Sequence, residues 1–188
     1  MSLSKKVTEQ KQSEKEEQKI KLEKTWIKNL ESSDEKVVSG ALKNIAKNGT
    51  ILSADALLKL LVSNSSSEKI QEELKDILKS VKSKAMLEVI IQWLDDERTA
   101  EHKAFLIYCI WEAGFQAEGH FETLAEHGIK GDYLTMLEVL TVIENFEGAI
   151  PEGQIINVNL SIDEALEDSQ NEKTALLLSL KEVIQNLG

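Results

Sequence analysis

The chain has 188 residues, a net charge of −11, 41% hydrophobic residues and a single cysteine. This much apolar material closes a core, so the composition excludes a chain that is disordered throughout. One cysteine excludes an intramolecular disulfide framework, and no apolar run reaches the roughly 18 to 20 residues that a membrane span requires.

Fold class and partner class both follow from the residue types. Helix formers dominate, whereas nine glycines and one proline are too few for a sheet protein with frequent turns, so we expect an all-α fold. The charge is uneven. Residues 1–93 hold 17 lysines and 14 acidic residues, and residues 94–188 hold 5 basic and 19 acidic ones. The acidic half disfavours nucleic acid and favours a Lys/Arg-rich protein or peptide partner.

The N-terminal segment, residues 1–19, is almost wholly polar, and we expect a charged tail that is either disordered or a solvated helix. An apolar stripe follows with Leu22, Trp26 and Leu30 at helical spacing, which predicts a helix that caps a single domain over residues 20–188. The segment has no apolar signal sequence, and the lone cysteine suits a reducing compartment. We therefore expect a cytoplasmic protein.

A degenerate repeat of 33 residues is the most informative feature of the sequence. The spacing is set by Glu35, Glu68 and Glu101, and a weaker fourth copy begins at Gly131. Aligned copies share two apolar columns, which are Ala41, Leu74, Ile107 and Leu140, and Leu58, Ile91 and Leu124. Each copy is predicted to be a pair of helices, because such pairs bury both apolar faces only when they stack on one another.

Local signals predict where the helices begin and end. Ser-x-x-Glu capping boxes occur at Ser32, Ser65, Ser161 and Ser169. Three glycines that suit a left-handed residue after a helix stand where first helices would end, at Gly49, Gly114 and Gly148. The second helices are expected over 54–62, 84–95 and 118–127.

The stretch KAFLIYCIWEAG, residues 103–114, carries eight successive apolar side chains from Ala104 to Trp111. Its aromatic and β-branched content would suit a strand, but its length and the flanking helical period favour a helix. We predict that it is the first helix of the third repeat, with neighbours on several sides that require apolar residues nearly all round.

Helix pairs of this length resemble the HEAT and armadillo repeats over about residues 32–147. The T-P-L-H-x-A pattern of ankyrin repeats and the W-x₂-L-G-x₂-Y pattern of tetratricopeptide repeats are both absent. The resemblance implies an α-α superhelix, a right-handed solenoid of about four to five helical hairpins whose second helices line a concave face. Such proteins mostly act as scaffolds that bind other proteins.

The C-terminal part departs from the repeat. Within 149–161, Ile156, Val158 and Leu160 alternate with polar residues as in a strand, although Pro151 would also suit the start of a helix. We interpret this segment as an irregular link packed against the last helix pair. A final helix over 172–186 is expected to close the stack with Ala175, Leu178 and Ile184.

The residues that could carry chemistry do not form a recognisable catalytic or metal-binding motif. Phosphate loops, dinucleotide fingerprints and hydrolase elbows are absent. His120 and His127 stand seven residues apart, about 10 Å along a helix, and cannot chelate one ion without another helix. Cys109 lies in the most apolar stretch and is expected to be a core residue. We expect no catalytic activity, no metal and no cofactor.

The candidate partner-binding surface combines one tryptophan with six acidic residues. Trp93 lies on a predicted second helix and is proposed as an apolar anchor, whereas Trp26 and Trp111 are expected in the core. The acidic candidates on the second and third of these helices are Asp95, Asp96, Glu97, Glu118, Glu122 and Glu126.

The function predicted from this surface is that of a non-catalytic scaffold that binds a protein or peptide. An acidic inhibitor or immunity-type protein that neutralises a basic toxin or enzyme is the alternative, and an enzyme with an unfamiliar site also stays open. The sequence leaves the oligomeric state open.

Overall fold

The computed structural model describes residues 3–63, 66–167 and 172–187. Every regular element in these ranges is helical, so the predicted all-α fold is confirmed. No helix in the same ranges is long and apolar enough to cross a bilayer. The chain forms two compact units, Met1–Leu78 (unit 1) and Lys79–Gly188 (unit 2).

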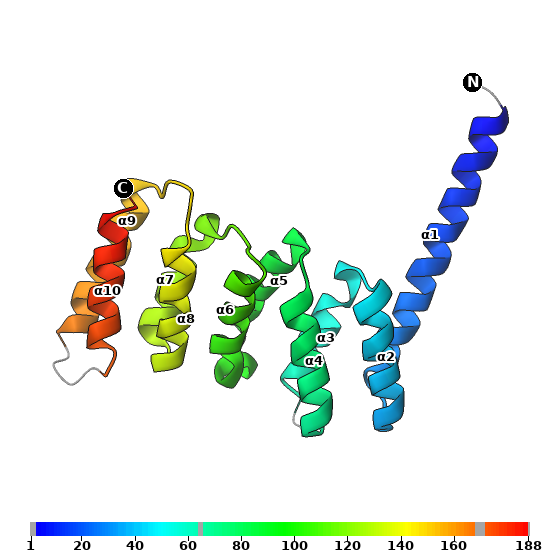
Figure 1. The fold of residues 1–188 in the computed structure, drawn as a ribbon, viewed down its shortest axis with the longest axis horizontal. Coiled ribbons are helices and arrows are strands. Elements are labelled where there is room, and N and C mark those ends of the chain that lie inside the picture. Colours follow the sequence, from blue (N-terminus) through cyan, green and yellow to red (C-terminus); the bar gives the residue numbers. More distant parts are fainter. Residues whose placement is uncertain (1–2, 64–65, 168–171, 188) are drawn as a thin grey trace. The chain divides into compact units, whose positions relative to one another are not determined.

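Unit 1 contains four α-helices and a short 3-10 helix, with α4 extending two residues beyond it (Figure 1). They are α1 (Leu3–Asn29), α2 (Glu35–Asn48), η1 (Ile51–Ser53), α3 (Ala54–Leu61) and α4 (Glu68–Ser80). Helix α1 runs through residue 19 without a break, and the side chains of residues 12–22 are all exposed. The predicted apolar stripe therefore begins too early: Leu22 faces solvent, whereas Leu30 at the other end of the stripe is buried as expected.

A buried carboxylate attaches α1 to η1. Glu23 is only 2% exposed. Its Oε1 accepts hydrogen bonds from the Thr50 N–H at 2.7 Å and the Ser53 hydroxyl at 2.5 Å, and its Oε2 accepts one from the Thr50 hydroxyl at 2.9 Å. These donors compensate the cost of burying the carboxylate. The burial of Glu23 could not be predicted from the sequence, because a charged residue next to the expected apolar stripe is ordinarily exposed.

The cap of α2 differs from the prediction. Asp34 is the N-cap and its Oδ1 accepts a hydrogen bond from the Lys36 N–H at 2.9 Å. The Ser32 hydroxyl instead accepts one from the Asp34 N–H at 3.1 Å. The capping box predicted at Ser32 is therefore wrong, because the neighbouring Asp34 is an equally good cap. Ser65 and Ser169 lie outside the described residues.

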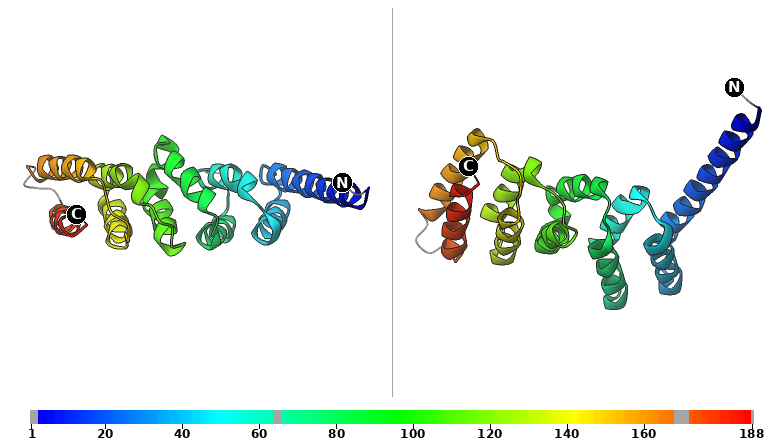
Figure 2. Two further views of the ribbon diagram at one scale, coloured as in Figure 1. Left: turned by 90° about the horizontal axis from the view of Figure 1, so that it is seen from above. Right: turned by 45° about the horizontal axis from the view of Figure 1, so that its top comes forward.

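Unit 2 contains six α-helices within its described residues. They are α5 (Lys84–Leu94), α6 (Lys103–Glu112), α7 (Phe121–Lys130), α8 (Tyr133–Glu144), α9 (Glu152–Leu166) and α10 (Thr174–Gln185), with short 3-10 helices η2 (Glu97–His102) and η3 (Glu118–His120). Helix α6 packs on α8 and α8 on α10, while α7 packs on α9 (Figures 1 and 2). Successive helices thus alternate between two layers, as in a stack of helix pairs or a helical bundle.

Two contacts show that α5 and α7 run in the same direction. His120 Nε2 lies 3.0 Å from Glu88 Oε1, and His127 Nε2 lies 3.2 Å from Asp95 Oδ1. Both pairs are 32 residues apart and follow the two helices in the same order. Parallel second helices one repeat apart are what the 33-residue period predicts for this unit.

The two apolar columns predicted from the repeat are confirmed as core positions. All seven side chains are at most 9% exposed. Residues 103–112 of the stretch 103–114 form α6, so its predicted helical conformation is confirmed, with Leu106, Ile107, Cys109 and Ile110 buried. Gly114 has φ +69°, the left-handed conformation expected after a helix, whereas Gly49 is extended. Among the described glycines no other has a positive φ, so the prediction fails at Gly148.

Helix α9 replaces the irregular link expected over 149–161. Its buried residues Val158 and Ile162 are four apart, which is helical spacing. The alternation was misleading because Ile156 and Leu160 belong to the solvent face. Ser161 lies inside α9 and its hydroxyl donates to the Asn157 carbonyl, so its predicted capping role is wrong.

Helix α10 buries a face different from the expected one. Its buried residues are Leu176, Leu177, Leu180 and Ile184. Ile184 is correctly predicted, but Ala175 and Leu178 are exposed. The short apolar run 175–178 fits more than one helical face, and only packing on α8 and α9 selects between them.

A candidate partner-binding groove

A groove of about 350 Å³ lies between α7 and α9 in unit 2. Its charged walls are formed by Glu122, Glu126 and Lys130 from α7 and by Glu164 from α9. Ile129 and Val158 contribute apolar surface, and Asn157 and Ser161 contribute neutral polar groups. Two of the six acidic candidates, Glu122 and Glu126, are therefore brought together, and Glu164 joins them from α9, although it was not among the predicted site residues.

The helix α9 also carries an exposed apolar pair. Ile156 is 52% exposed and Leu160 is 64% exposed. They are four residues apart and so share one face of the helix. Leu160 is also four residues before Glu164 and directly before Ser161, two groove residues. The exposed apolar pair thus lies next to groove residues along the helix α9.

The groove carboxylates have weak internal partners. Glu126 pairs with Lys130 one helical turn later, and this hydrogen bond holds the pKa of Glu126 below its usual value. Both side chains are more than 60% exposed, so the pair contributes little to stability. Glu122 accepts a hydrogen bond from the Asn157 amide at 2.8 Å. A cationic partner can replace such contacts at small cost.

Asp95 lies outside the groove and belongs to a polar relay across three helices. His127 Nε2 is 3.2 Å from Asp95, and Lys103 Nζ is 3.3 Å from His127 Nδ1. Burial and the adjacent Lys103 ammonium lower the pKa of His127, although Asp95 and Glu126 act in the opposite direction. The arrangement fits a neutral imidazole that accepts from Lys103 and donates to Asp95.

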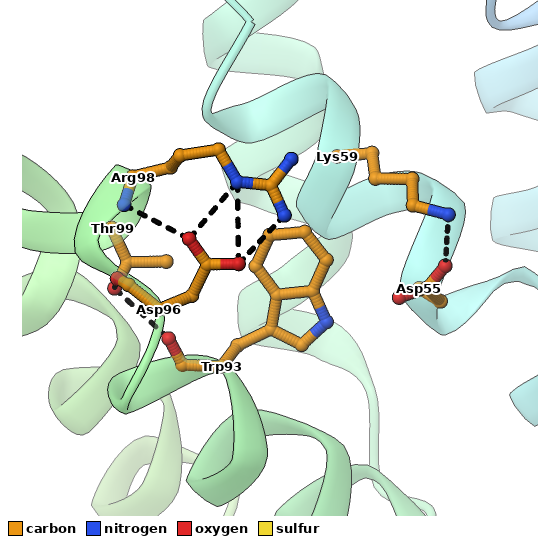
Figure 3. Close-up of polar contacts among 6 residues, drawn as sticks. All are labelled: Asp55, Lys59, Trp93, Asp96, Arg98 and Thr99. Carbon is orange, nitrogen blue, oxygen red and sulfur yellow. Dashed lines mark hydrogen bonds and ion pairs between the residues drawn. The ribbon is translucent and has the colours of Figure 1, made fainter.

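Trp93 does not have the exposed position expected of an anchor. It is 7% exposed, and the Arg98 guanidinium lies 5.1 Å from its ring centroid (Figure 3). Arg98 also binds both carboxylate oxygens of Asp96, which lowers the pKa of Asp96 to about 2. The single arginine of the chain thus occupies both the aromatic face and one of the acidic candidates. A contact between residues five apart in a turn was not evident from the sequence.

Glu118 and Glu97 also lie apart from the groove. Glu118 Oε1 accepts hydrogen bonds from the Glu147 and Gly148 N–H groups at 3.1 and 2.9 Å. Burial raises the pKa of Glu118, but these backbone donors lower it more. Glu118 therefore orders the loop after α8, whereas Glu97 is exposed at the start of η2.

The described residues contain no cluster of three or more His, Cys, Asp or Glu side chains that could hold a metal ion. Cys109 is 1% exposed, and burial raises its pKa to about 12. A thiol in that state is not a nucleophile at neutral pH.

Comparisons with known proteins leave the family of this chain open. No protein-family model matches the sequence. A search of curated proteins likewise finds no significant match. The resemblance to HEAT and armadillo repeats therefore depends on the period and on the parallel helices of unit 2.

Proposed function

We propose that this protein is a non-catalytic interaction module whose α7–α9 groove binds a Lys/Arg-rich protein segment. One observation carries the proposal: Glu122, Glu126 and Glu164 line a hollow to which Ile129 and Val158 contribute apolar surface. A lysine or arginine side chain has the matching form, since its aliphatic stem packs on apolar surface while its charged head meets carboxylates. Cytoplasmic location, a HEAT-like superhelix and the absence of an enzymatic role belong to the same proposal.

The exposed pair on α9 replaces Trp93 as the apolar anchor of this model. Ile156 and Leu160 each directly precede a groove residue along α9 and are exposed, unlike the buried indole of Trp93. Binding energy is concentrated in a few apolar or aromatic anchors, and charges mainly steer and orient the partner. The segment that fits best therefore has basic residues next to one or two large apolar residues.

Titration of a labelled peptide library tests the proposal. Twelve-residue peptides that combine Lys or Arg with one apolar residue are titrated by fluorescence anisotropy at low and moderate salt. The variant Glu122→Gln/Glu126→Gln/Glu164→Gln is expected to weaken the best peptide about tenfold, at roughly 0.5 kcal/mol for each exposed carboxylate. Leu160→Ser is expected to weaken it about fivefold, as for a moderate hot spot.

Matched control variants distinguish an effect of the groove residues on binding from an effect of the protein's overall charge. Glu101→Gln/Glu144→Gln/Glu182→Gln makes the same charge change at exposed sites of unit 2 outside the groove. Leu178→Ser removes a leucine of α10 that is likewise more than half exposed. If these controls weaken binding as much as the groove variants, the groove is not the binding site.

The alternative function, an acidic inhibitor of a basic toxin or enzyme, uses the same surface. It is favoured by the concentration of charge, since residues 79–188 hold 8 basic and 20 acidic residues. Such inhibitors bind one folded partner tightly at one-to-one stoichiometry, with strong salt dependence. Micromolar binding to many short peptides supports the scaffold instead.

A further inference from the structure

Unit 1 contains a pocket of about 460 Å³ that the groove model does not use. Its lining combines the C-terminal ends of α1 and α3 with the N-terminal ends of α2 and α4. The five larger apolar side chains of the lining are Ile27, Leu30, Val38, Leu60 and Ile70, and Ala56 adds a methyl group. The volume lies within the range of roughly 300 to 1,000 Å³ that is typical of small-ligand sites.

The charge at the pocket is negative. Glu31 and Glu35 contribute carboxylates, and no described residue pairs with either side chain. Lys59 also lines the pocket and forms an exposed ion pair with Asp55 at 2.6 Å, so it offsets only one of the two carboxylates. The C-terminal ends of α1 and α3 and the N-terminal ends of α2 and α4 carry partial charges of opposite sign that offset one another, so the carboxylates set the sign of the charge. An anion is therefore disfavoured, and a cation with an apolar stem matches the lining.

We propose that this pocket binds an alkylammonium group, with its aliphatic chain on the apolar floor and its ammonium between Glu31 and Glu35. The group comes either from a lysine side chain of a protein partner or from a free aliphatic amine. The site belongs to unit 1 and shares no residue with the α7–α9 groove. A negative result for the unit 1 pocket therefore leaves the groove proposal intact, and a negative result for the groove leaves the pocket proposal intact.

Methyl NMR on the full-length protein tests the pocket with n-butylammonium as the probe, and n-butyrate and n-butanol as controls of equal chain length. Butylammonium is expected to shift the methyl signals of the five larger apolar lining residues in a saturable way. The variant Glu31→Gln/Glu35→Gln is expected to raise its Kd about tenfold, roughly threefold for each exposed charge. Ala56→Met, which places a longer side chain in the pocket lining, is expected to abolish the shifts.

A matched control and a second set of ligands complete the experiment. Glu16→Gln/Glu72→Gln removes two exposed carboxylates of unit 1 that do not line the pocket, and it is expected to leave the Kd unchanged. Tighter binding of a lysine-containing peptide than of butylammonium assigns the site to a protein partner, and tighter binding of 1,5-diaminopentane assigns it to a free amine. Equal shifts with butyrate or butanol, or a Kd unchanged by Glu31→Gln/Glu35→Gln, overturn the proposal.

Discussion

Lys173 connects the stability of unit 2 to the groove, and its replacement by methionine is the most informative structural test. The side chain is 7% exposed. Its Nζ donates hydrogen bonds to the carbonyls of Ile129 and Gly131, each at 2.5 Å, and of Gly128 at 3.3 Å. These carbonyls end α7, the helix that provides Glu126 and Lys130. Methionine keeps an apolar stem of similar length and removes only the ammonium.

The expected loss of stability is smaller than the number of hydrogen bonds implies. Each bond from a charged donor is worth about 1.5 to 3 kcal/mol. The cost of dehydrating the ammonium offsets much of this gain, and the same burial lowers the pKa of Lys173. We therefore expect Lys173→Met to reduce the free energy of unfolding by about 2 kcal/mol, which corresponds to a fall in Tm of roughly 4 to 8 °C.

Urea denaturation and amide hydrogen exchange measure this effect. Exchange is expected to accelerate most in the last turn of α7, because its carbonyls lose their partner. Lys181→Met on α10 is the matched control, since Lys181 forms a single ion pair with Asp163, and a change below about 1 kcal/mol is expected for it. Equal effects of the two variants, or unchanged exchange in α7, would refute the capping role of Lys173.

Three further predictions concern unit 2. A Cβ on Gly128 would lie 3.0 Å from the facing side chain of α8, so Gly128→Ala is expected to cost about 1 to 3 kcal/mol in urea denaturation. Gly119→Ala, where nothing lies within 4 Å, is expected to show no such overpacking. The lowered pKa of His127 means that the folded protein favours the neutral imidazole. The contribution of His127 to the free energy of unfolding is therefore complete above about pH 6.5, its unfolded pKa, and declines as the pH falls below that value. His127→Gln is expected to flatten this pH dependence of stability, and an unchanged pH profile would contradict the prediction. Cys109 should react with a thiol reagent only on unfolding, and rapid labelling of the native protein would disprove its burial.

Many core positions could be predicted from the sequence because they depend on the periodicity of apolar residues. Ile107 and Leu140, 33 residues apart, are buried as the alignment requires. The helical identity of 103–114 followed from its length and flanking period, although its apolar residues are continuous. Burial of α6 on several sides explains why a helix can carry an unbroken run of apolar residues.

The faces of α9 and α10 could not be predicted because apolar residues there also point to solvent. Leu160 and Leu178 are more than half exposed, and an exposed leucine cannot be distinguished from a buried one by residue type. At Ile156 this exposure produced a false two-residue alternation in a helix. Only the packing partners of each helix resolve the ambiguity.

The candidate site was predicted in part. Glu122 and Glu126 were selected by charge and position and line the groove, but Glu164 required knowledge that α9 packs beside α7. Contacts within the protein exclude other predicted binding residues. The Arg98 guanidinium lies over the Trp93 ring and binds Asp96, a side-chain geometry within one turn that composition does not contain.

Zero-length cross-linking tests the central claim most directly. A carbodiimide joins lysines of the best basic peptide to carboxylates that they contact, and mass spectrometry identifies the joined residues. The groove model predicts cross-links at Glu122, Glu126 and Glu164, which disappear at high salt and with excess unlabelled peptide. Cross-links spread over the acidic residues of unit 2, or concentrated at Glu101, Glu144 and Glu182, would contradict the model.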